Sequence, residues 1–279
     1  MDTTATGSFG HDNGATTPQA RHGSARLSPS ESASIPGRTH ADAAPAAEAG
    51  AVHGSWLSAR MYDFVLTLAE RAGMAEHRRA LVGRTSGAVL EIGAGTGLNL
   101  GYYPDGLDRL VLCEPEPHMA SRLERRVAQL TRRAEVVRAT AETLPFEDET
   151  FDTVVSTLVL CTVTNPQATL NEIRRVLRPR GSLLFLEHVR SDERRLARWQ
   201  DRFHRPWRAF AAGCNCNRQT LQRLRDHGYT VTVTGRGRWR RMPPIVRPLI
   251  VGQATPSGRP PGQARATDDG HDQRQLMAV

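Results

Sequence analysis

A short apolar run at residues 88–92 ends in a loop that holds three glycines within five residues, at positions 93–97. An apolar run that ends in such a loop predicts a buried strand, a tight turn and a following helix. Glycine suits this turn because it adopts positive φ without steric cost and lets a ligand approach the backbone. The next helix would direct free N–H groups and its positive dipole end at that ligand. We therefore expect a nucleotide-type loop.

The spacing of the glycines separates two classes of nucleotide ligand. Dinucleotide folds use G-x-G-x-x-G or G-x-G-x-x-A, but counting from Gly93 places Leu98 where the third small residue should stand. The loop reads instead as E-x-G-x-G-x-G from Glu91 to Gly97. This pattern resembles the first motif of the class I S-adenosylmethionine-dependent methyltransferases. A glycine turn without a ligand stays open as an alternative at this point.

Length, charge and cysteine content narrow the class of protein. The 279 residues are enough for one domain of roughly 200 residues with tails. All 37 basic residues are Arg, and the net charge of +8 permits nucleic acid or anionic lipid as a partner without requiring either. Four cysteines are too few and too clustered for a disulfide framework. The longest apolar run, at 154–163, is far short of the roughly 20 residues that span a bilayer, so we expect a soluble, cytoplasmic protein.

Three segments are expected along the chain. Residues 1–52 and 254–279 are polar or rich in Gly and Pro, which predicts disordered tails around a domain at 53–253. Strand patterns alternate with helical patterns, which predicts an α/β fold with parallel pairing and right-handed crossovers. Ligands of such sheets bind at the carboxyl ends of the strands. The expected strands are 88–92, 109–113, 135–138, 151–161, 182–188, 229–234 and 245–253.

Glu114 stands at the end of the second predicted strand, 21 residues beyond Gly93. An acidic side chain there can accept hydrogen bonds from both ribose hydroxyls of a bound nucleoside. The geometry serves NAD and S-adenosylmethionine alike, so Glu114 supports a nucleoside ligand without choosing between them. The alternative is that Glu114 binds no ligand and that its negative charge is stabilised by the dipole at the start of the next helix.

The segment between the third and fourth predicted strands decides between the two ligands. It reads A-E-T-L-P-F at 141–146 and is followed by F-D-T-V at 151–154. This spacing resembles the methyltransferase region whose loop cups the adenine ring, and the resemblance implies a backbone donor at Ala141 and a side-chain contact from Glu142. V-L-R-P-R-G at 176–181 is similar to the same family, and we expect a turn or left-handed glycine at its end.

The chain is thus identified as resembling the class I methyltransferases with a type 11 domain. The resemblance implies S-adenosylmethionine as the cofactor. It also implies a Rossmann-like sheet of seven mostly parallel strands, in the order 3-2-1-4-5-7-6 with the last strand antiparallel. The cofactor contacts that it implies are Glu91, Gly93, Ala94, Gly95, Gly97, Glu114, Pro115, Ala141, Glu142, Thr157 and Leu158.

The C-terminal third is rich in arginine, with 15 Arg and four acidic residues at 190–247. Apolar side chains from 196 to 210 form one helical stripe, which could pack on the sheet, cover a substrate or lie on a membrane surface. The C-x-C pair at 214–216 has no second pair, so we expect no metal. The fourth strand ends in S-T-L-V rather than the N/D-P-P-Y/F of base-amine methyltransferases, so no nucleic-acid substrate is expected.

A narrower resemblance joins several later motifs, at 157–163, 176–181, 187–189, 206–207 and 213–215. Their combination is similar to methyltransferase-like proteins that methylate alkyl thiols, over residues 89 to 252. The animal members have an apolar N-terminal anchor, whereas the first residues here are polar. The resemblance implies a small apolar acceptor, with a thiol as one choice. A quinone or natural-product C- or O-methyltransferase and a non-catalytic, Arg-rich binding module stay open. Candidate acceptor contacts are Tyr62, Trp199, Trp207, Cys214 and Asn215.

His188, at the end of the fifth predicted strand, is the candidate catalytic base. A thiol with a pKa near ~8.5 must lose its proton to be a good nucleophile. An imidazole with a pKa near ~6.5 can accept that proton at neutral pH. A histidine that only hydrogen-bonds the backbone is the alternative. Glu187 could orient His188, although neighbouring strand residues point to opposite faces.

Overall fold

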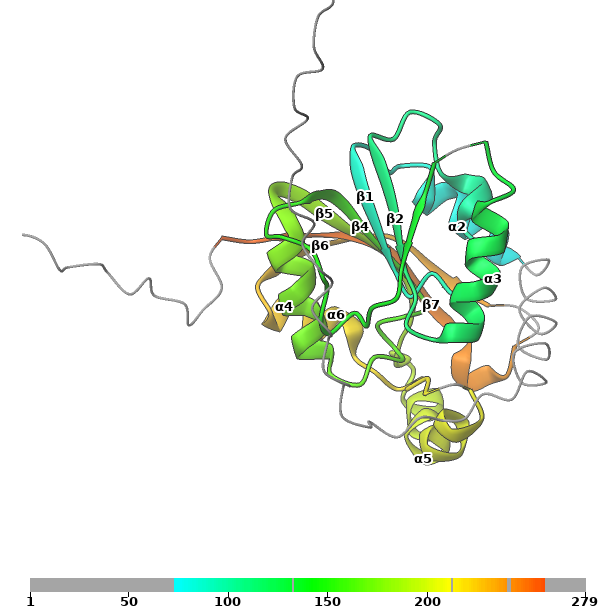
Figure 1. The fold of residues 1–279 in the computed structure, drawn as a ribbon. Coiled ribbons are helices and arrows are strands. Elements are labelled where there is room, and N and C mark those ends of the chain that lie inside the picture. The colour runs from blue at the N-terminus through cyan, green and yellow to red at the C-terminus, as the bar shows by residue number, and fades with distance from the viewer. Residues whose placement is uncertain (1–72, 132, 212, 240–241, 259–279) are drawn as a thin grey trace, which may run out of the picture. The chain divides into compact units, whose positions relative to one another are not determined.

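The computed structural model describes residues 73–131, 133–211, 213–239 and 242–258. Within these ranges the chain forms one seven-stranded sheet with helices on both faces (Figure 1). Residues 53–72 of the predicted domain and both predicted tails lie outside the described residues, apart from the first residues after 253. The helices are α2 (Ala75–Val82), α3 (Pro117–Val127), α4 (Pro166–Val176), α5 (Arg194–Phe210) and α6 (Thr220–Asp226), with 3₁₀ turns η2 (Leu100–Tyr102) and η3 (Pro244–Val246).

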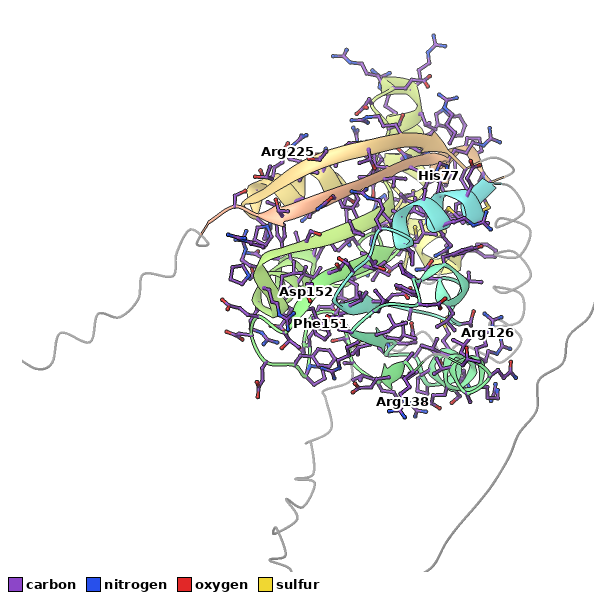
Figure 2. All side chains as sticks on the ribbon, turned by 90° about the horizontal axis from the view of Figure 1, so that it is seen from above. His77, Arg126, Arg138, Phe151, Asp152 and Arg225 are labelled. Atoms are coloured by element: carbon purple, nitrogen blue, oxygen red, sulfur yellow. The ribbon has the colours of Figure 1, made fainter. Side chains whose placement is uncertain are left out.

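The strand order is β3-β2-β1-β4-β5-β7-β6, as the resemblance implied. The first five strands pair in parallel, and β7 runs antiparallel to both β5 and β6. Figure 2 places Arg138, just after β3, and Arg225, on α6, toward opposite edges of this sheet. The strands are β1 (Ala88–Ile92), β2 (Arg109–Cys113), β3 (Glu135–Val137), β4 (Phe151–Thr157), β5 (Leu177–His188), β6 (Tyr229–Arg238) and β7 (Pro248–Pro256).

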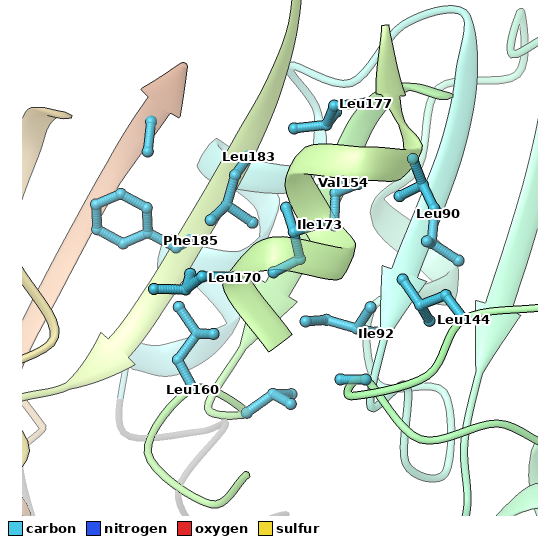
Figure 3. Close-up of a cluster of buried hydrophobic side chains, with 14 of the residues drawn as sticks. Leu90, Ile92, Leu144, Val154, Leu160, Leu170, Ile173, Leu177, Leu183 and Phe185 are labelled. Carbon is cyan, nitrogen blue, oxygen red and sulfur yellow. The ribbon is translucent and has the colours of Figure 1, made fainter. Parts of the chain in front are cut away.

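Helix α4 covers the middle of one face of the sheet. Asn165 caps its first turn by accepting hydrogen bonds from the backbone N–H groups of Gln167 and Ala168, and Pro166 occupies the first helical position. Its inward side chains are spaced three and four residues apart, so they form one apolar stripe. The stripe is formed by Leu170, Ile173 and Val176. It packs on side chains from β1, β4 and β5 (Figure 3), including Ile92, Val154, Leu183 and Phe185.

Helices α2 and α3 cover the opposite face. The carboxylate of Glu116 accepts a hydrogen bond of 2.6 Å from the Met119 N–H and so caps α3, with Pro117 at its start. Leu123 of α3 packs against β1, β2 and β4, whereas Leu81 of α2 packs against β5 and β7. Both faces of the parallel strands are therefore buried, which explains their nearly continuous apolar sequences.

The fourth strand is shorter than predicted. It ends at Thr157, because Leu158 has a positive φ of 63° and turns the chain out of the strand direction. The predicted extension through residue 161 is wrong for this reason. A run of apolar residues cannot distinguish a strand from a buried turn that follows it.

The fifth strand is longer than predicted and begins at Leu177. The left-handed or turn position expected at Gly181 is wrong, since this residue lies inside β5 and has no positive φ. A Cβ at Gly181 would come within 3.0 Å of the backbone oxygens of Arg178 and Asp152. Close packing of β5 on the start of β4 therefore explains this glycine. Figure 2 labels Asp152 there, and its carboxylate accepts hydrogen bonds from the Ala88 N–H and from Arg178.

The last two strands also differ from the predicted limits: β6 is longer than predicted, and the start predicted at residue 245 for the last strand is wrong because η3 occupies Pro244–Val246. β6 continues to Arg238, and β7 runs from Pro248 to Pro256, three residues past the predicted domain boundary at 253. A proline inside a predicted strand suggests an edge strand or a bulge. Pro248 is instead the first residue of β7, which lies between β5 and β6 in the sheet. A proline is tolerated at the first position because little of the hydrogen-bond ladder has begun.

Candidate active site at the carboxyl edge of the sheet

The three glycines of the loop after β1 have different structural reasons. All three have positive φ, 57° at Gly93, 58° at Gly95 and 84° at Gly97. A Cβ at Gly93 would lie 2.6 Å from Val159, and one at Gly97 would lie 2.6 Å from Leu100. A Cβ at Gly95 would meet no atom within 4 Å. Packing thus requires Gly93 and Gly97, whereas Gly95 borders open space that a ligand can enter.

Glu114 lies directly beside this open glycine. Its carboxylate accepts hydrogen bonds of 2.8 Å from the Gly95 N–H and 2.9 Å from the Glu116 N–H. Burial raises the pKa of Glu114, while the two backbone hydrogen bonds oppose that rise. The structure therefore joins the loop after β1 to the acidic end of β2, as expected for a site that holds a ribose. Pro115, the next predicted contact, is exposed beside it.

Glu91 is not open to a ligand in this structure. It is buried, and its two carboxylate oxygens accept hydrogen bonds from the Asn99 amide at 2.7 Å and the Tyr103 hydroxyl at 2.6 Å. Burial raises the pKa of Glu91 to about 7, and these bonds limit the rise. Glu91 therefore braces the segment that follows the glycine loop.

Thr157 belongs to the same buried network. Arg78 on α2 donates hydrogen bonds of 3.0 Å to the Thr157 hydroxyl and to the Asn99 side-chain oxygen. The network ties α2, β1 and the end of β4 to the loop, so it sets the relative positions of three predicted cofactor segments. The roles of Arg78 and Asn99 were not predicted from the sequence. Each is simply a polar residue near an apolar segment, and no local sequence pattern marks it as part of a site.

The loop after β3 is held against α4. Ala141 is buried in the core, and Glu142 accepts hydrogen bonds from the N–H groups of Thr164, at 2.9 Å, and Asn165, at 3.3 Å. The Leu144 N–H donates to Glu172 at 2.7 Å. The structure thus gives the Glu142 side chain a role at the start of α4, in addition to the ligand contact that the resemblance implied.

Glu187 shapes the turn at the end of β4. One carboxylate oxygen accepts hydrogen bonds from the Ser156 hydroxyl at 2.7 Å and from the N–H groups of Val159 and Leu160 at 3.1 Å. The other accepts from the Cys161 N–H at 3.3 Å. Burial raises the pKa of Glu187 to about 7, and these bonds oppose the rise. From the sequence, Glu187 was expected only to orient His188. A glutamate within an apolar strand is nevertheless a signal of a buried carboxylate that needs hydrogen-bond donors.

His188 points to the other face of β5. Its ring lies 5.3 Å from the ring of Trp239, and its Nδ1 atom is buried with no hydrogen-bond partner among the described residues. Burial lowers the pKa of His188 to about 4. The imidazole is therefore neutral at pH 7 and has little tendency to bind a proton, which disagrees with the ordinary pKa on which its expected role as a base rested.

The predicted acceptor contacts separate into two groups. The Cys214 thiol is buried 3.8 Å from the Cys161 thiol, and Asn215 donates its backbone N–H to the Cys161 oxygen at 2.8 Å. These two residues therefore lie at the turn after β4. Trp199 is exposed on α5, Trp207 is partly buried on the same helix, and Tyr62 lies outside the described residues.

The described residues at this edge offer no cluster of metal ligands. In the part of the chain that the structure describes, no group of three His, Cys, Asp or Glu residues could hold a metal ion. A polar cavity of about 560 Å³ lies between α5 and α6, lined by Arg190, Asp201, Asn215, Arg218 and Arg223 among others. It contains none of the predicted cofactor contacts. The expected position of the cofactor is therefore inferred from the geometry of the loops after β1 and β3.

Comparison with known proteins agrees with this geometry. Residues 90–185 match a methyltransferase domain family. The human thiol S-methyltransferase TMT1B is 34% identical over 200 residues, which cover 67% of this chain and 80% of that protein. The chain belongs to this family of class I S-adenosylmethionine-dependent methyltransferases. The human thiol S-methyltransferase TMT1A is 32% identical over 185 residues, covering 61% of this chain and 75% of that protein.

Solved structures share the fold of this methyltransferase. A possible histamine N-methyltransferase from Thermotoga maritima has a TM-score of 0.53 at 22% identity, covering 71% of this chain and 96% of that chain. The YcgJ protein of Bacillus subtilis has a TM-score of 0.54 at 14% identity, covering 66% and 100%. At these identities the likeness shows the fold alone.

The residues at the carboxyl edge fit S-adenosylmethionine, the cofactor of the family. Gly95 leaves its side of the loop open, and Glu114 offers a carboxylate with further lone pairs for ribose hydroxyls. Ala141 and Glu142 stand on the adjacent loop after β3. Among the described residues, no helix is both long enough and apolar enough to cross a membrane.

Proposed function

We propose that this methyltransferase transfers the methyl group of S-adenosylmethionine to the sulfur atom of a small apolar thiol. The observation that carries the proposal is the extent of the similarity to human TMT1B. It runs over 200 residues, about twice the length of the matched domain, so it includes segments outside residues 90–185. The cofactor motifs are shared by many methyltransferases, whereas the segments after β5 supply the acceptor side.

For methyl transfer, the main task of the protein is to position the cofactor and the acceptor. The bound cofactor supplies a methyl group that is already activated as a sulfonium, so orientation of the acceptor contributes most to the rate. The Arg78–Glu91–Asn99–Thr157 network holds the cofactor loop against β4. Glu187 holds the turn at residues 158–161 from the other face of the sheet. Together they set the distance between the cofactor loop and the acceptor side.

His188 acts in this proposal as a neutral hydrogen-bond acceptor that orients the thiol. Proton transfer from a thiol of pKa ~8.5 to an imidazole of pKa about 4 is unfavourable by roughly 6 kcal/mol. The unpaired Nδ1 atom can instead accept a hydrogen bond from an S–H group. The apolar side chains around it, from Trp239, Leu186 and Leu249, favour an apolar acceptor. The thiol then loses its proton to solvent rather than to His188.

The proposal is tested by methyl transfer from a radiolabelled cofactor to matched alkyl thiols, alcohols, phenols, quinols and amines. Release of S-adenosylhomocysteine serves as a second readout. We expect transfer to the thiols and little to an alcohol of the same carbon skeleton. Preferred transfer to a quinol or phenol would replace the thiol by the quinone or natural-product alternative. Cofactor binding without transfer to any of these classes would favour a binding module.

A further inference from the structure

Helix α5 presents an aromatic stripe to solvent. The exposed fractions are 58% for Trp199, 37% for Phe203 and 81% for Phe210. In the described ranges, Leu130 at 36% is the one other large apolar side chain with such exposure. The rings of Trp199 and Phe203 stack at a centroid distance of 5.1 Å. At ~100° per residue, the three aromatic side chains fall within about 40° of one another around the helix.

The stripe cannot turn inward, because Gln200 fixes the rotation of α5. The Gln200 side chain is fully buried, and its amide nitrogen donates to the backbone oxygens of Val189, Cys216 and Ile245 at 3.1, 3.0 and 2.9 Å. Its side-chain oxygen accepts from the Ser191 N–H at 2.7 Å. A roll that buried the aromatic rings would break these bonds and leave polar atoms unpaired in the core. The exposure of the stripe is therefore part of the fold.

Positive charge accompanies the stripe. Helix α5 carries six exposed arginines against one acidic residue, Asp201, which pairs with Arg190 at 2.7 Å. Arg195 and Arg202 lie on the free side of the stripe, about 40–60° from Trp199 around the helix. Figure 1 shows α5 at the lower end of the sheet, apart from the helices that cover its faces, and in Figure 2 its side chains project outward at the top of the view. The arginines are Arg194, Arg195, Arg198, Arg202, Arg205 and Arg208.

We propose that α5 docks on the surface of a bilayer that contains anionic lipid. The aromatic stripe enters the head-group region, and the neighbouring arginines bind lipid phosphates. Interfacial helices have this arrangement, with aromatic residues on one side and arginines beside them. Single-stranded nucleic acid is a poorer match, because its binding sites place aromatic rings inside a positively charged groove rather than on a projecting helix.

Docking would bring the bilayer to the acceptor side of the enzyme. Gln200 bonds the backbone oxygen of Val189, the residue after His188, so α5 is anchored at the end of β5. An apolar acceptor dissolved in the bilayer would then be delivered next to the site. This consequence rests on the proposed function, whereas binding itself does not.

The test is co-sedimentation of the full chain with vesicles of phosphatidylcholine alone or of phosphatidylcholine with phosphatidylserine, without cofactor or acceptor. We expect binding to the anionic vesicles that is at least tenfold tighter than to the neutral ones. The paired change Trp199→Ser with Phe203→Ser should weaken it at least tenfold. Leu130→Ser, the matched control on an exposed apolar residue outside α5, should not. Thermal melting checks that each variant is folded, and exposed positions predict little change.

Two further variants keep the proposal refutable if the double serine variant does not fold. Arg195→Gln with Arg202→Gln should weaken binding to anionic vesicles. Quenching of tryptophan fluorescence by brominated lipid should be lost in Trp199→Phe. Equal binding to both vesicle types, or quenching that persists without Trp199, would overturn the proposal. Tight binding of single-stranded DNA that the serine changes abolish, with no vesicle binding, would assign the stripe to nucleic acid. Because no methyl transfer is measured, failure here leaves the proposed function intact.

Discussion

Replacing Glu187 with glutamine should change how the stability of the protein depends on pH. The folded-state pKa of about 7 lies above the ordinary value of 4.5, so the folded protein binds more protons than the unfolded chain between these pH values. The free energy of unfolding therefore falls as pH rises through this window. A difference of about 2.5 pKa units corresponds to roughly 3 kcal/mol. Glutamine does not titrate, so this part of the pH dependence should vanish in the variant.

The two proteins are best compared by urea unfolding at several pH values from 5 to 8, followed by tryptophan fluorescence. The other titrating groups, including Glu91 and His188, are present in both proteins, so their contributions cancel in the difference. We expect wild type to lose about 2.5 kcal/mol relative to Glu187→Gln between the ends of that range. At low pH the variant should be the less stable protein, because its amide N–H₂ faces the Cys161 N–H where a carboxyl oxygen stood.

A stability difference that stays constant with pH would refute this reasoning. It would mean that the four hydrogen bonds outweigh burial and hold the pKa of Glu187 in its ordinary range. Ser156→Ala is the matched control, since it removes one donor and keeps the carboxylate. That change should raise the pKa of Glu187 further and move the loss of stability to higher pH.

Gly95→Val should abolish cofactor binding in calorimetry, because the new side chain would fill the space that Gly95 leaves open to a ligand and because a φ of 58° disfavours a branched residue; unchanged affinity would contradict this. Glu114→Ala should weaken cofactor binding at least tenfold, whereas Glu135→Ala, at an exposed ion pair with Arg109, should not. His188→Ala should lower thiol turnover without changing its pH profile, since an imidazole with a pKa of about 4 stays neutral from pH 6 to 9. Loss of an inflection near pH 6.5 in that variant would restore His188 as the base.

The first two parallel strands could be predicted residue by residue, whereas the end of β4 and the start of β5 could not. The strands at Ala88–Ile92 and Arg109–Cys113 were predicted with their observed ends, because both are apolar runs that stop at a glycine or a charged residue. The loop after β1 was recognised from glycines whose positive φ is a local property of the backbone. The strand order came from the family resemblance rather than from any local pattern.

The acceptor side could not be predicted in the same way. The turn at Leu158 is imposed by Glu187, which is 29 residues away in sequence and on a different strand. The low pKa of His188 depends on burial beside Trp239, a side chain from beyond β6. Glu142 meets the start of α4 because two loops pack together. Each of these interactions depends on segments that sequence periodicity treats separately.

The sequence alone determined the first two strands and the glycine loop after β1 in this methyltransferase, because glycine conformation and apolar strand patterns act over a few neighbouring residues. The tertiary structure alone decided which ionisable groups are buried and what they bind. It showed that Glu91 and Glu187 brace loops, that Gly95 alone among the three glycines of the loop after β1 borders open space, and that α5 cannot bury its aromatic stripe. Burial and pairing are properties of the packed chain, since a pKa or an exposed surface depends on every segment that surrounds the group.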